Sequence, residues 1–332
     1  MKKLLKALLQ NVSPAALSLI LPALLHAQAI KIDGSSTVYP ISKKAADDFH
    51  KLMKGTITAS VTISGTGGGF RKFCLEETDI NDASRPIQKH ELEACKKLGV
   101  QFIELPLAYD ALTVLVNPLN DWVKSFTVGG LKQLWEPAAE GRITKWRQLN
   151  PRWPNRAIKL FAPGADSGTF DYFTEAIIGK ATASRTDYKA SEDDAVLFHG
   201  IAKDRDALGY FGYGYYVENQ KKLRAVPIDS GTGPVLPSVQ TVEDGTYQPL
   251  SRPLFIYVSK KSLDRAETRQ FIAFYLARAS QIVKQLKYVP LPARGYELAI
   301  ERVRNGRYGT AFGGKSEVGM TIESLLKHEP KH

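Results

Sequence analysis

Three segments of this chain combine small hydroxyl residues with glycine, and each stands between a strand-like run and a helix-like run. They are 34–37 (Gly-Ser-Ser-Thr), 64–70 (Ser-Gly-Thr-Gly-Gly-Gly-Phe) and 162–170 (Ala-Pro-Gly-Ala-Asp-Ser-Gly-Thr-Phe). The first N–H groups of a helix lack partners within it and carry about half a unit of positive partial charge, so helix openings bind anions. Three such openings predict strands that lead into helices and one shared site for a small oxyanion.

The rest of the chain alternates strand-like and helix-like runs, which predicts a mostly parallel sheet flanked by helices. The predicted strands are 29–32, 56–63, 80–83, 101–107, 112–116, 157–161 and 254–258. The predicted helices are 41–53, 71–77, 89–98, 126–135, 195–202, 264–279 and 296–306. Residues 235–253 are expected to form a loop. The Gly- and Tyr-rich run 208–216 is expected to be an internal strand with stacked aromatic rings, the alternative being a platform for a ligand.

The predicted strands 112–116 and 254–258 pair naturally, and the chain between them forms an insertion. Two crossings of this kind can act as a hinge over a ligand. The expected organisation is a signal peptide at 1–29, lobe I at 30–115 and 255–327, lobe II at 116–254, and a tail at 328–332.

The first residues have the composition of a secretory signal peptide. Lys2, Lys3 and Lys6 precede an apolar run at 15–25 and a small-x-small cleavage site at 27–29. An uncleaved membrane anchor is the alternative, but the apolar run is shorter than the ~20 residues that span a bilayer. No cysteine lies near the cleavage site to carry a lipid. We therefore expect a soluble periplasmic protein.

Charge and cysteine content narrow the function further. The formal net charge is +11 at pH 7, yet export and the lack of a basic run interleaved with aromatics argue against nucleic-acid binding. The two cysteines, Cys74 and Cys95, are expected to form a disulfide in an oxidising compartment. The six histidines are scattered, and no metal-binding spacing occurs, so neither a metal nor another cofactor is expected.

Five segments in order carry a family resemblance: 33–40, 64–70, 83–86, 109–113 and 166–170. Together they resemble the periplasmic phosphate-binding proteins of the phosphate-specific ABC transport system (PstS-like), and the likeness extends over nearly all of the mature chain. It implies an α/β, type II-like fold with two lobes, each a mixed, mostly parallel sheet flanked by helices, joined by two hinge strands. It also implies a non-enzymatic monomer that binds inorganic phosphate with high affinity and delivers it to an inner-membrane permease and its ATPase.

Carried over by position, the resemblance places phosphate contacts in all three turns: Ser36, Thr37, the Val38 amide, Thr66, Gly67, Ser167, Gly168 and Thr169. The better-studied branch of the family has an aspartate where this chain has Arg85, and an arginine where it has Pro163. We therefore expect Arg85 to supply the cation and Asp166, or else Asp110, to accept the phosphate proton. Sulfate lacks that proton, so phosphate is expected to bind much more tightly than sulfate.

Other interpretations remain open at this point. Ser36 and Thr37 can serve as helix caps alone, and Arg85 can belong to an ordinary surface ion pair. The ligand can be another, sulfate-like oxyanion, or the protein can be an extracellular phosphate scavenger without a transporter. A secreted serine hydrolase with Ser167 as nucleophile needs a histidine base, from His50, His90 or His199. The glycine run at 67–69 lacks the Gly-Lys-Ser/Thr ending of a nucleotide-binding loop.

Overall fold

The computed structural model describes residues 29–165, 167–315, 318–321 and 325, so the predicted signal peptide, apart from Ala29, and the predicted tail lie outside the described residues. Its main sheet runs in the order β2 (Ala59–Val61), β1 (Ile30–Gly34), β3 (Ile80–Ala83), β12 (Ser251–Ser259), β4 (Phe102–Val116), β8 (Ala207–Gly212), β6 (Lys159–Ala162) and β7 (Lys189–Ala190). Strands β13 (Val289–Pro290) and β9 (Arg224–Ala225) also pair with β4. A second sheet joins β11 (Pro234–Val235), β10 (Ile228–Asp229) and β5 (Phe126–Thr127).

The main sheet is mixed rather than mostly parallel. Strand β1 is parallel to β2 and β3, and β6 is parallel to β7 and β8. In the centre, β12 is antiparallel to β3 and β4, and β4 is antiparallel to β8. The parallel pairs agree with the predicted strand–helix alternation, whereas the central strands β3, β12, β4 and β8 form antiparallel pairs.

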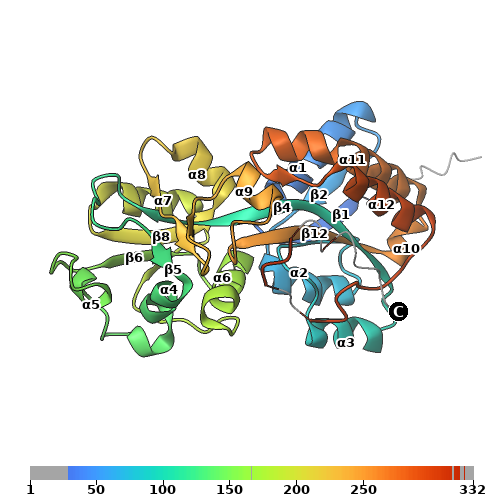
Figure 1. Ribbon diagram of the computed structural model, residues 1–332. Helices are drawn as coiled ribbons and strands as arrows, with labels where there is room; N and C mark the ends of the chain where they lie inside the picture. Colours follow the sequence, from blue (N-terminus) through green and yellow to red (C-terminus); the bar gives the residue numbers. More distant parts are fainter. Residues whose placement is uncertain (1–28, 166, 316–317, 322–324, 326–332) are drawn as a thin grey trace, which may run out of the picture.

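Helices cover both faces of the sheet. Near β1 they are α1 (Tyr39–Leu52), α2 (Gly65–Cys74), α3 (Lys89–Lys97), α10 (Lys260–Leu263), α11 (Ala266–Gln285) and α12 (Ala293–Arg304). Figure 1 shows α1, α11 and α12 on one face and α2 and α3 on the other. Helix α1 buries Ile41, Ala45 and Phe49, which recur every four residues, so one apolar stripe faces the core. In the described residues no helix has the length and apolar character of a membrane span.

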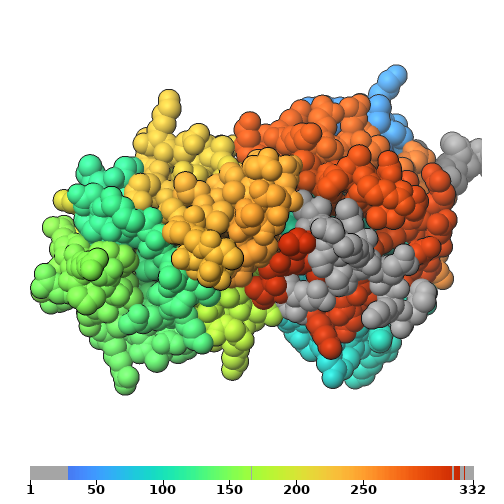
Figure 2. All heavy atoms as spheres, viewed as in Figure 1, coloured from blue at the N-terminus to red at the C-terminus, as the bar shows by residue number. Residues whose placement is uncertain are grey.

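The other end of the molecule carries α4 (Val128–Trp135), a 3₁₀ turn η1 (Pro137–Ala139), α5 (Trp146–Leu149), α6 (Gly168–Ile178), α7 (Asp194–Lys203) and α8 (Tyr213–Asn219). Strands β4 and β12 run from this end to the end that contains β1 (Figure 1). Within β4, residues 102–111 pair with β12, and residues 112–116 pair with β8. Figure 2 shows the orange-yellow segment that includes α9 (Val239–Glu243) over the middle of the molecule.

Several predicted boundaries differ from the structure. The strands predicted at 101–107 and 112–116 are one strand, β4, whose 15 residues are all buried. The predicted loop 235–253 contains α9 and the first residues of β12, because Arg252 and Pro253 pair with Asp110 and Tyr109 across the sheet. The predicted strand 208–216 ends at Gly212, where α8 begins. In the second case, long-range pairing outweighs the local turn signals of proline and glycine.

Helix α2 begins at Gly65 rather than near Arg71, so the glycine run lies inside the helix. The reason is close packing against the end of β1. A Cβ atom at Gly69 would lie 2.6 Å from the Cα of Gly34 and 2.0 Å from Oδ1 of Asn81. Only a residue without a side chain lets the helix approach this closely, which offsets the low helix propensity of glycine.

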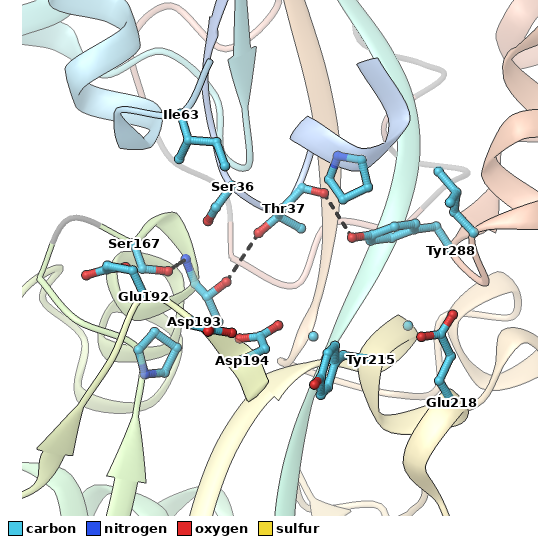
Figure 3. A pocket seen from close by; sticks show the side chains of 16 residues that line it. Ser36, Thr37, Ile63, Ser167, Glu192, Asp193, Asp194, Tyr215, Glu218 and Tyr288 are labelled. Carbon is cyan, nitrogen blue, oxygen red and sulfur yellow. Dashed lines mark hydrogen bonds between the residues drawn. The ribbon is translucent and has the colours of Figure 1, made fainter. Parts of the chain in front are cut away.

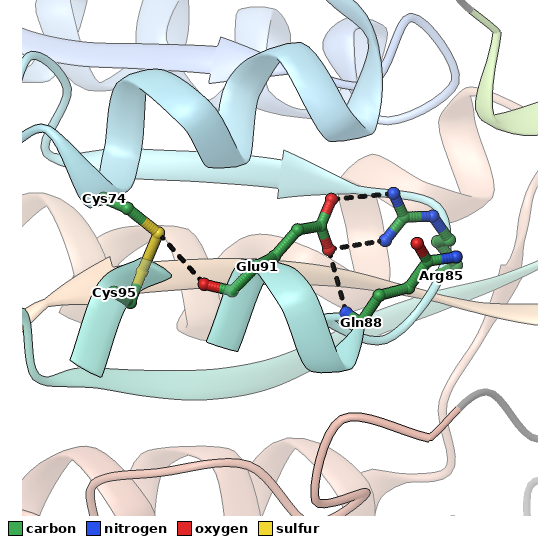
Figure 4. The surroundings of a disulfide bond; sticks show 5 residues. All are labelled: Cys74, Arg85, Gln88, Glu91 and Cys95. Atoms are coloured by element: carbon green, nitrogen blue, oxygen red, sulfur yellow. Dashed lines mark hydrogen bonds and ion pairs between the residues drawn. A yellow bond between two sulfur atoms is a disulfide. The ribbon is translucent and has the colours of Figure 1, made fainter. Parts of the chain in front are cut away.

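The predicted disulfide between Cys74 and Cys95 is confirmed. It joins the end of α2 to α3, and Glu91 of α3 lies between it and Arg85 (Figure 4).

Candidate functional site

The three predicted turns lie together. Oγ1 of Thr37, which precedes α1, is 3.3 Å from Oγ1 of Thr169 at the start of α6. A Cβ atom at Gly168 would lie 2.9 Å from Oγ1 of Thr66 in the first turn of α2, and 2.0 Å from Oγ of Ser84. The folded chain thus brings one hydroxyl-bearing turn from each of three helices to one place.

Local hydrogen bonds fix each turn. Ser167 caps α6, because its Oγ accepts from the amide of Thr169 at 3.1 Å. The amide of Thr37 donates to Oγ of Ser35 at 3.2 Å. Oγ1 of Thr66 accepts from the amide of Ser84 at 3.2 Å. A side-chain helix cap is therefore present at Ser167, whereas Ser36 and Thr37 do not cap α1, whose N-cap is Val38 without a side-chain hydrogen bond.

A cavity of about 420 Å³ opens beside these turns. Ser36, Thr37, Ser167 and Thr169 line one part of it, and Tyr288 donates from its OH to the carbonyl of Thr37 at 2.9 Å. Further lining comes from carboxylates and a tyrosine, as Figure 3 shows: Glu192, Asp193, Asp194, Tyr215 and Glu218. The cavity thus combines hydroxyl donors with carboxylate acceptors.

Val38 is the N-cap of α1 and is buried. Gly67 lies beside Arg85, since a Cβ atom there would be 3.6 Å from Nη2 of Arg85. Neither Gly67 nor Arg85 is among the residues that line the cavity. Asp166 lies outside the described residues.

Arg85 is almost fully buried and is paired with a carboxylate. Its Nη1 and Nη2 donate to the two carboxylate oxygens of Glu91, each at 2.8 Å (Figure 4). Its Nε makes no hydrogen bond among the described residues and lies 3.8 Å from Oδ2 of Asp171. Of the five N–H donors of the guanidinium, Glu91 takes two and the carbonyl of Pro86 takes a third at 3.2 Å, so one N–H of Nη2 and the N–H of Nε are left for other partners.

Arg252 is the cation at the turns, and it was not among the predicted site residues. The residue is fully buried on β12. Its Nη1 donates to the carbonyl of Gly168 at 2.6 Å, and its Nη2 donates to Oγ1 of Thr169 at 2.9 Å and of Thr37 at 3.2 Å. One guanidinium thus binds residues that precede α1 and residues that open α6.

Arg252 is held in place by Asp110 on the neighbouring strand. Nη2 and Nε of Arg252 lie 3.1 Å and 3.3 Å from Oδ2 of Asp110, and the two residues are register partners. Burial raises the pKa of Asp110, and the charge of Arg252 opposes that rise. The only sequence signal was a lone arginine before a proline, in a segment predicted to be a loop, so the pairing was not apparent.

Asp194 is a second residue that the sequence analysis did not single out. It is the first residue of α7 and lines the cavity. Burial, with the charges of Asp110 and Asp193, raises its pKa to about 7. A carboxyl group in this state can accept or donate a hydrogen bond near neutral pH.

The arrangement around Ser167 differs from that of a hydrolase nucleophile. Its Oγ is the acceptor of the α6 cap, and no histidine is among the residues that line the cavity in the described part of the chain. His50 contacts the carbonyl of Ile57 through Nδ1, and the ring of His199 lies 4.9 Å from that of Phe198.

Beneath the first turn lies a buried carboxyl group. The carbonyl of Asp82 accepts from the amide of Ser35 at 2.9 Å, and its Oδ1 accepts from Oγ of Ser42 at 2.7 Å. Oγ of Ser42 is 2.9 Å from the OH of Tyr275. Burial raises the pKa of Asp82 from 3.8 to about 8, opposed by the hydrogen bond from Ser42 and assisted by the charge of Asp33.

This carboxyl group makes stability depend on pH. The unfolded chain loses the Asp82 proton near its ordinary pKa, whereas the folded chain retains it to about pH 8. The unfolded state is therefore increasingly favoured as the pH rises from about 4 to about 8, by at most about 6 kcal/mol. Urea unfolding of the protein and of Asp82→Asn across this range is the measurement. As the pH rises, we expect the unfolding free energy of the unchanged protein to fall relative to that of Asp82→Asn. If the two unfolding free energies change with pH in parallel, Asp82 does not cause the pH dependence.

Comparisons with known proteins agree with this architecture. A family model described as a PBP superfamily domain matches residues 22–279. Protein SphX of Synechocystis sp. is 52% identical over 303 residues, covering 91% of this chain and 90% of that protein. Phosphate-binding protein PstS of Staphylococcus saprophyticus is 37% identical over 271 residues, covering 80% of this chain and 82% of that protein.

A solved structure described as a possible phosphate binding protein from Planctomyces limnophilus matches with a TM-score of 0.67 and 43% identity. The match covers 83% of this chain and 98% of that one. The mixed sheet with helices on both faces is therefore the α/β fold of the PBP superfamily.

Proposed function

The chain belongs to the family of the SphX and PstS phosphate-binding proteins, and from that membership we propose that it binds inorganic phosphate with high affinity and delivers it to an inner-membrane ABC transporter. The resemblance seen in the sequence is thereby confirmed. The PstS relatives are named as phosphate-binding proteins, which confirms the expectation of a binding protein rather than an enzyme. The observation that carries the proposal is that three helix-opening turns meet, and that the guanidinium of Arg252 binds two of them.

These groups suit a tetrahedral oxyanion. Hydroxyls, helix-opening amides and a guanidinium donate hydrogen bonds without a metal, and charge-assisted bonds contribute roughly 1.5–3 kcal/mol each. Micromolar affinity requires only about −8 kcal/mol. A handful of such bonds therefore leaves free energy to offset dehydration of the ion and ordering of the protein.

We assign the phosphate contacts to the predicted residues of the three turns: Ser36, Thr37, the Val38 amide, Thr66, Gly67, Ser167, Gly168 and Thr169. Arg252 is proposed as the principal cation, because its guanidinium binds Thr37, Gly168 and Thr169 directly, whereas Arg85 is bound to Glu91. The acceptor of the phosphate proton is proposed to be Asp166, with Asp110 and Asp194 as the alternatives.

We further propose that the molecule works as two lobes. Residues 30–115 and 255–327 form lobe I, residues 116–254 form lobe II, and β4 and β12 are the hinge strands. The change of partner along β4, from β12 to β8, supports this division. Arg252 and Asp110 then lie on the two hinge strands, next to the turns that would close on the ion.

Location and partners follow from the family. We propose that residues 1–29 direct export and are removed, and that the protein is a periplasmic monomer that docks on the permease and its ATPase. A scavenger without a transporter is the alternative for the partner, and a sulfate-like oxyanion is the alternative for the ligand. Phosphate uptake in cells that lack this protein tests whether it serves a transporter. Direct titration tests whether the ligand is phosphate or a sulfate-like oxyanion.

Calorimetric titration of the protein, freed of bound anion by unfolding and refolding, tests the ligand. We expect one phosphate to bind per chain with micromolar or tighter affinity, and sulfate to bind at least about 10³-fold more weakly, because sulfate offers no proton to the carboxylate acceptor. Sulfate binding tighter than phosphate would overturn the assignment of the ligand.

Three variants then identify the acceptor. Asp166→Asn is expected to narrow the difference between phosphate and sulfate, since an amide does not demand a proton from the ligand. If the ratio of the two dissociation constants stays the same, Asp110→Asn and Asp194→Asn are compared in the same titration. The acceptor is the residue whose replacement narrows the ratio.

A further inference from the structure

We propose that Glu91, Arg85 and Asp171 form a latch that holds α6 against the 84–85 segment when the site is closed, and so sets how slowly phosphate leaves. The inference rests on the proposed function, because it takes α6 to lie in lobe II and Arg85 in lobe I. It gives Arg85 a positioning role instead of a place in the ligand shell.

The geometry of α6 couples the latch to the phosphate turns. Gly168 and Asp171 are three residues apart, so they lie on the same face of the helix. Gly168 packs on Ser84, where a Cβ atom would be 2.0 Å from Oγ. Asp171 faces the next residue, Arg85, with Oδ2 3.8 Å from Nε. The turn that carries Ser167, Gly168 and Thr169 therefore reaches its place together with Asp171.

The lobe I side of the latch is held rigidly. Glu91 binds both terminal nitrogens of Arg85, and its Oε2 also accepts from the amide of Gln88 at 2.8 Å in the capping box of α3. The side chains of Arg85 and Glu91 are only 4% and 5% exposed. The Cys74–Cys95 disulfide ties α3 to α2 (Figure 4). Arg85 thus presents its Nε from a fixed position.

The Asp171 side of the latch depends on closure. Its side chain is 18% exposed in this arrangement, and a separation of 3.8 Å is an ion pair without a direct hydrogen bond. Opening of the lobes would return the Asp171 carboxylate to water, while Arg85 would keep its partner Glu91. The ion pair between Arg85 and Asp171 therefore favours the closed form specifically.

A latch and a ligand contact have different kinetic signatures. In the proposed latch, Arg85 and Asp171 have no contact with the ion, so their replacement should act equally on every bound anion. We expect Asp171→Asn to speed phosphate release by about tenfold with little change in the association rate. The ratio of the phosphate and sulfate dissociation constants should stay the same. Asp171→Glu, which retains the charge, should recover part of the loss.

The experiment is stopped-flow measurement of inorganic phosphate release on four proteins: the unchanged chain, Asp171→Asn, Arg85→Met with Glu91→Gln, and all three substitutions together. The paired substitution removes the buried ion pair as a unit, which avoids leaving Glu91 charged and unpaired. Asp171→Asn should speed release in the unchanged chain and have no effect in the paired background.

Three outcomes decide the matter. An equal effect of Asp171→Asn in both backgrounds, or no effect in either, overturns the latch while leaving phosphate binding intact. A change in the phosphate-to-sulfate ratio also overturns it, since Asp171 would then touch the ligand. Failure of the unchanged chain to bind phosphate refutes the proposed function itself.

Discussion

Replacement of Arg252 by methionine is expected to weaken phosphate binding by about 10³-fold or more, which corresponds to about 4 kcal/mol. The guanidinium joins Thr37, Gly168 and Thr169 at hydrogen-bond distance and is fully buried. Calorimetric titration with phosphate measures the loss, and Arg252→Lys should recover only part of it, because an ammonium lacks the planar fork.

Arg252→Met also leaves Asp110 buried without its partner, which by itself can cost about 3–5 kcal/mol of stability. The combined variant Arg252→Met with Asp110→Asn removes both charges and should fold better than Arg252→Met while still binding phosphate poorly. Arg185→Met is the matched control. Arg185 is also buried and paired, with Asp187, but bonds to the carbonyls of Leu134 and Ile143 away from the site. Phosphate affinity retained in Arg252→Met would show that the turns bind the ion without this cation.

Gly34→Ala is expected to lower the free energy of unfolding by on the order of 4 kcal/mol. The φ angle of Gly34 is +137°, which only glycine adopts readily, and a Cβ atom would lie 2.2 Å from the carbonyl oxygen of Asp82. That atom is backbone in the adjacent strand and cannot rotate away. Because Gly34 leads directly into the first turn, phosphate affinity should fall as well. Urea unfolding and phosphate titration of the same preparation give both quantities.

Gly99→Ala is the control that separates the cost of a positive φ angle from the cost of the contact with Asp82. Gly99 has a φ of +72°, and a Cβ atom there would meet nothing within 4 Å. The substitution therefore carries only the cost of the backbone conformation, about 1 kcal/mol. If Gly34→Ala and Gly99→Ala destabilise the protein equally, the contact with Asp82 has no energetic weight.

Local signals predicted much of the fold. The opening of α6 carries the capping residue Ser167, and α1 has a proline in its first turn. Apolar runs mark the strands, because these preferences act over a few neighbouring residues. The continuous strand β4 and the early start of α2 were missed. In both cases the cause is packing between distant segments, which local propensity does not report.

The candidate site divides in the same way. The hydroxyls of Thr37 and Thr169 were predicted from their turns, and they are 3.3 Å apart. The sequence does not show which arginine lies at the turns, since Arg85 and Arg252 are both single arginines followed by proline. Their surroundings differ because Arg85 is six residues from Glu91, whereas Arg252 meets Asp110 across 142 residues.

The sequence by itself determined the family, the three turns and the pair of cysteines, because these are properties of residue type and order along the chain. Only the tertiary structure decided which arginine meets the turns and which carboxylate neutralises each one. The register of β12 on β4 sets Arg252 opposite Asp110, and the packing of α6 sets Asp171 beside Arg85. A buried charge needs an oppositely charged partner beside it. Partners from distant segments become neighbours only when the chain has folded.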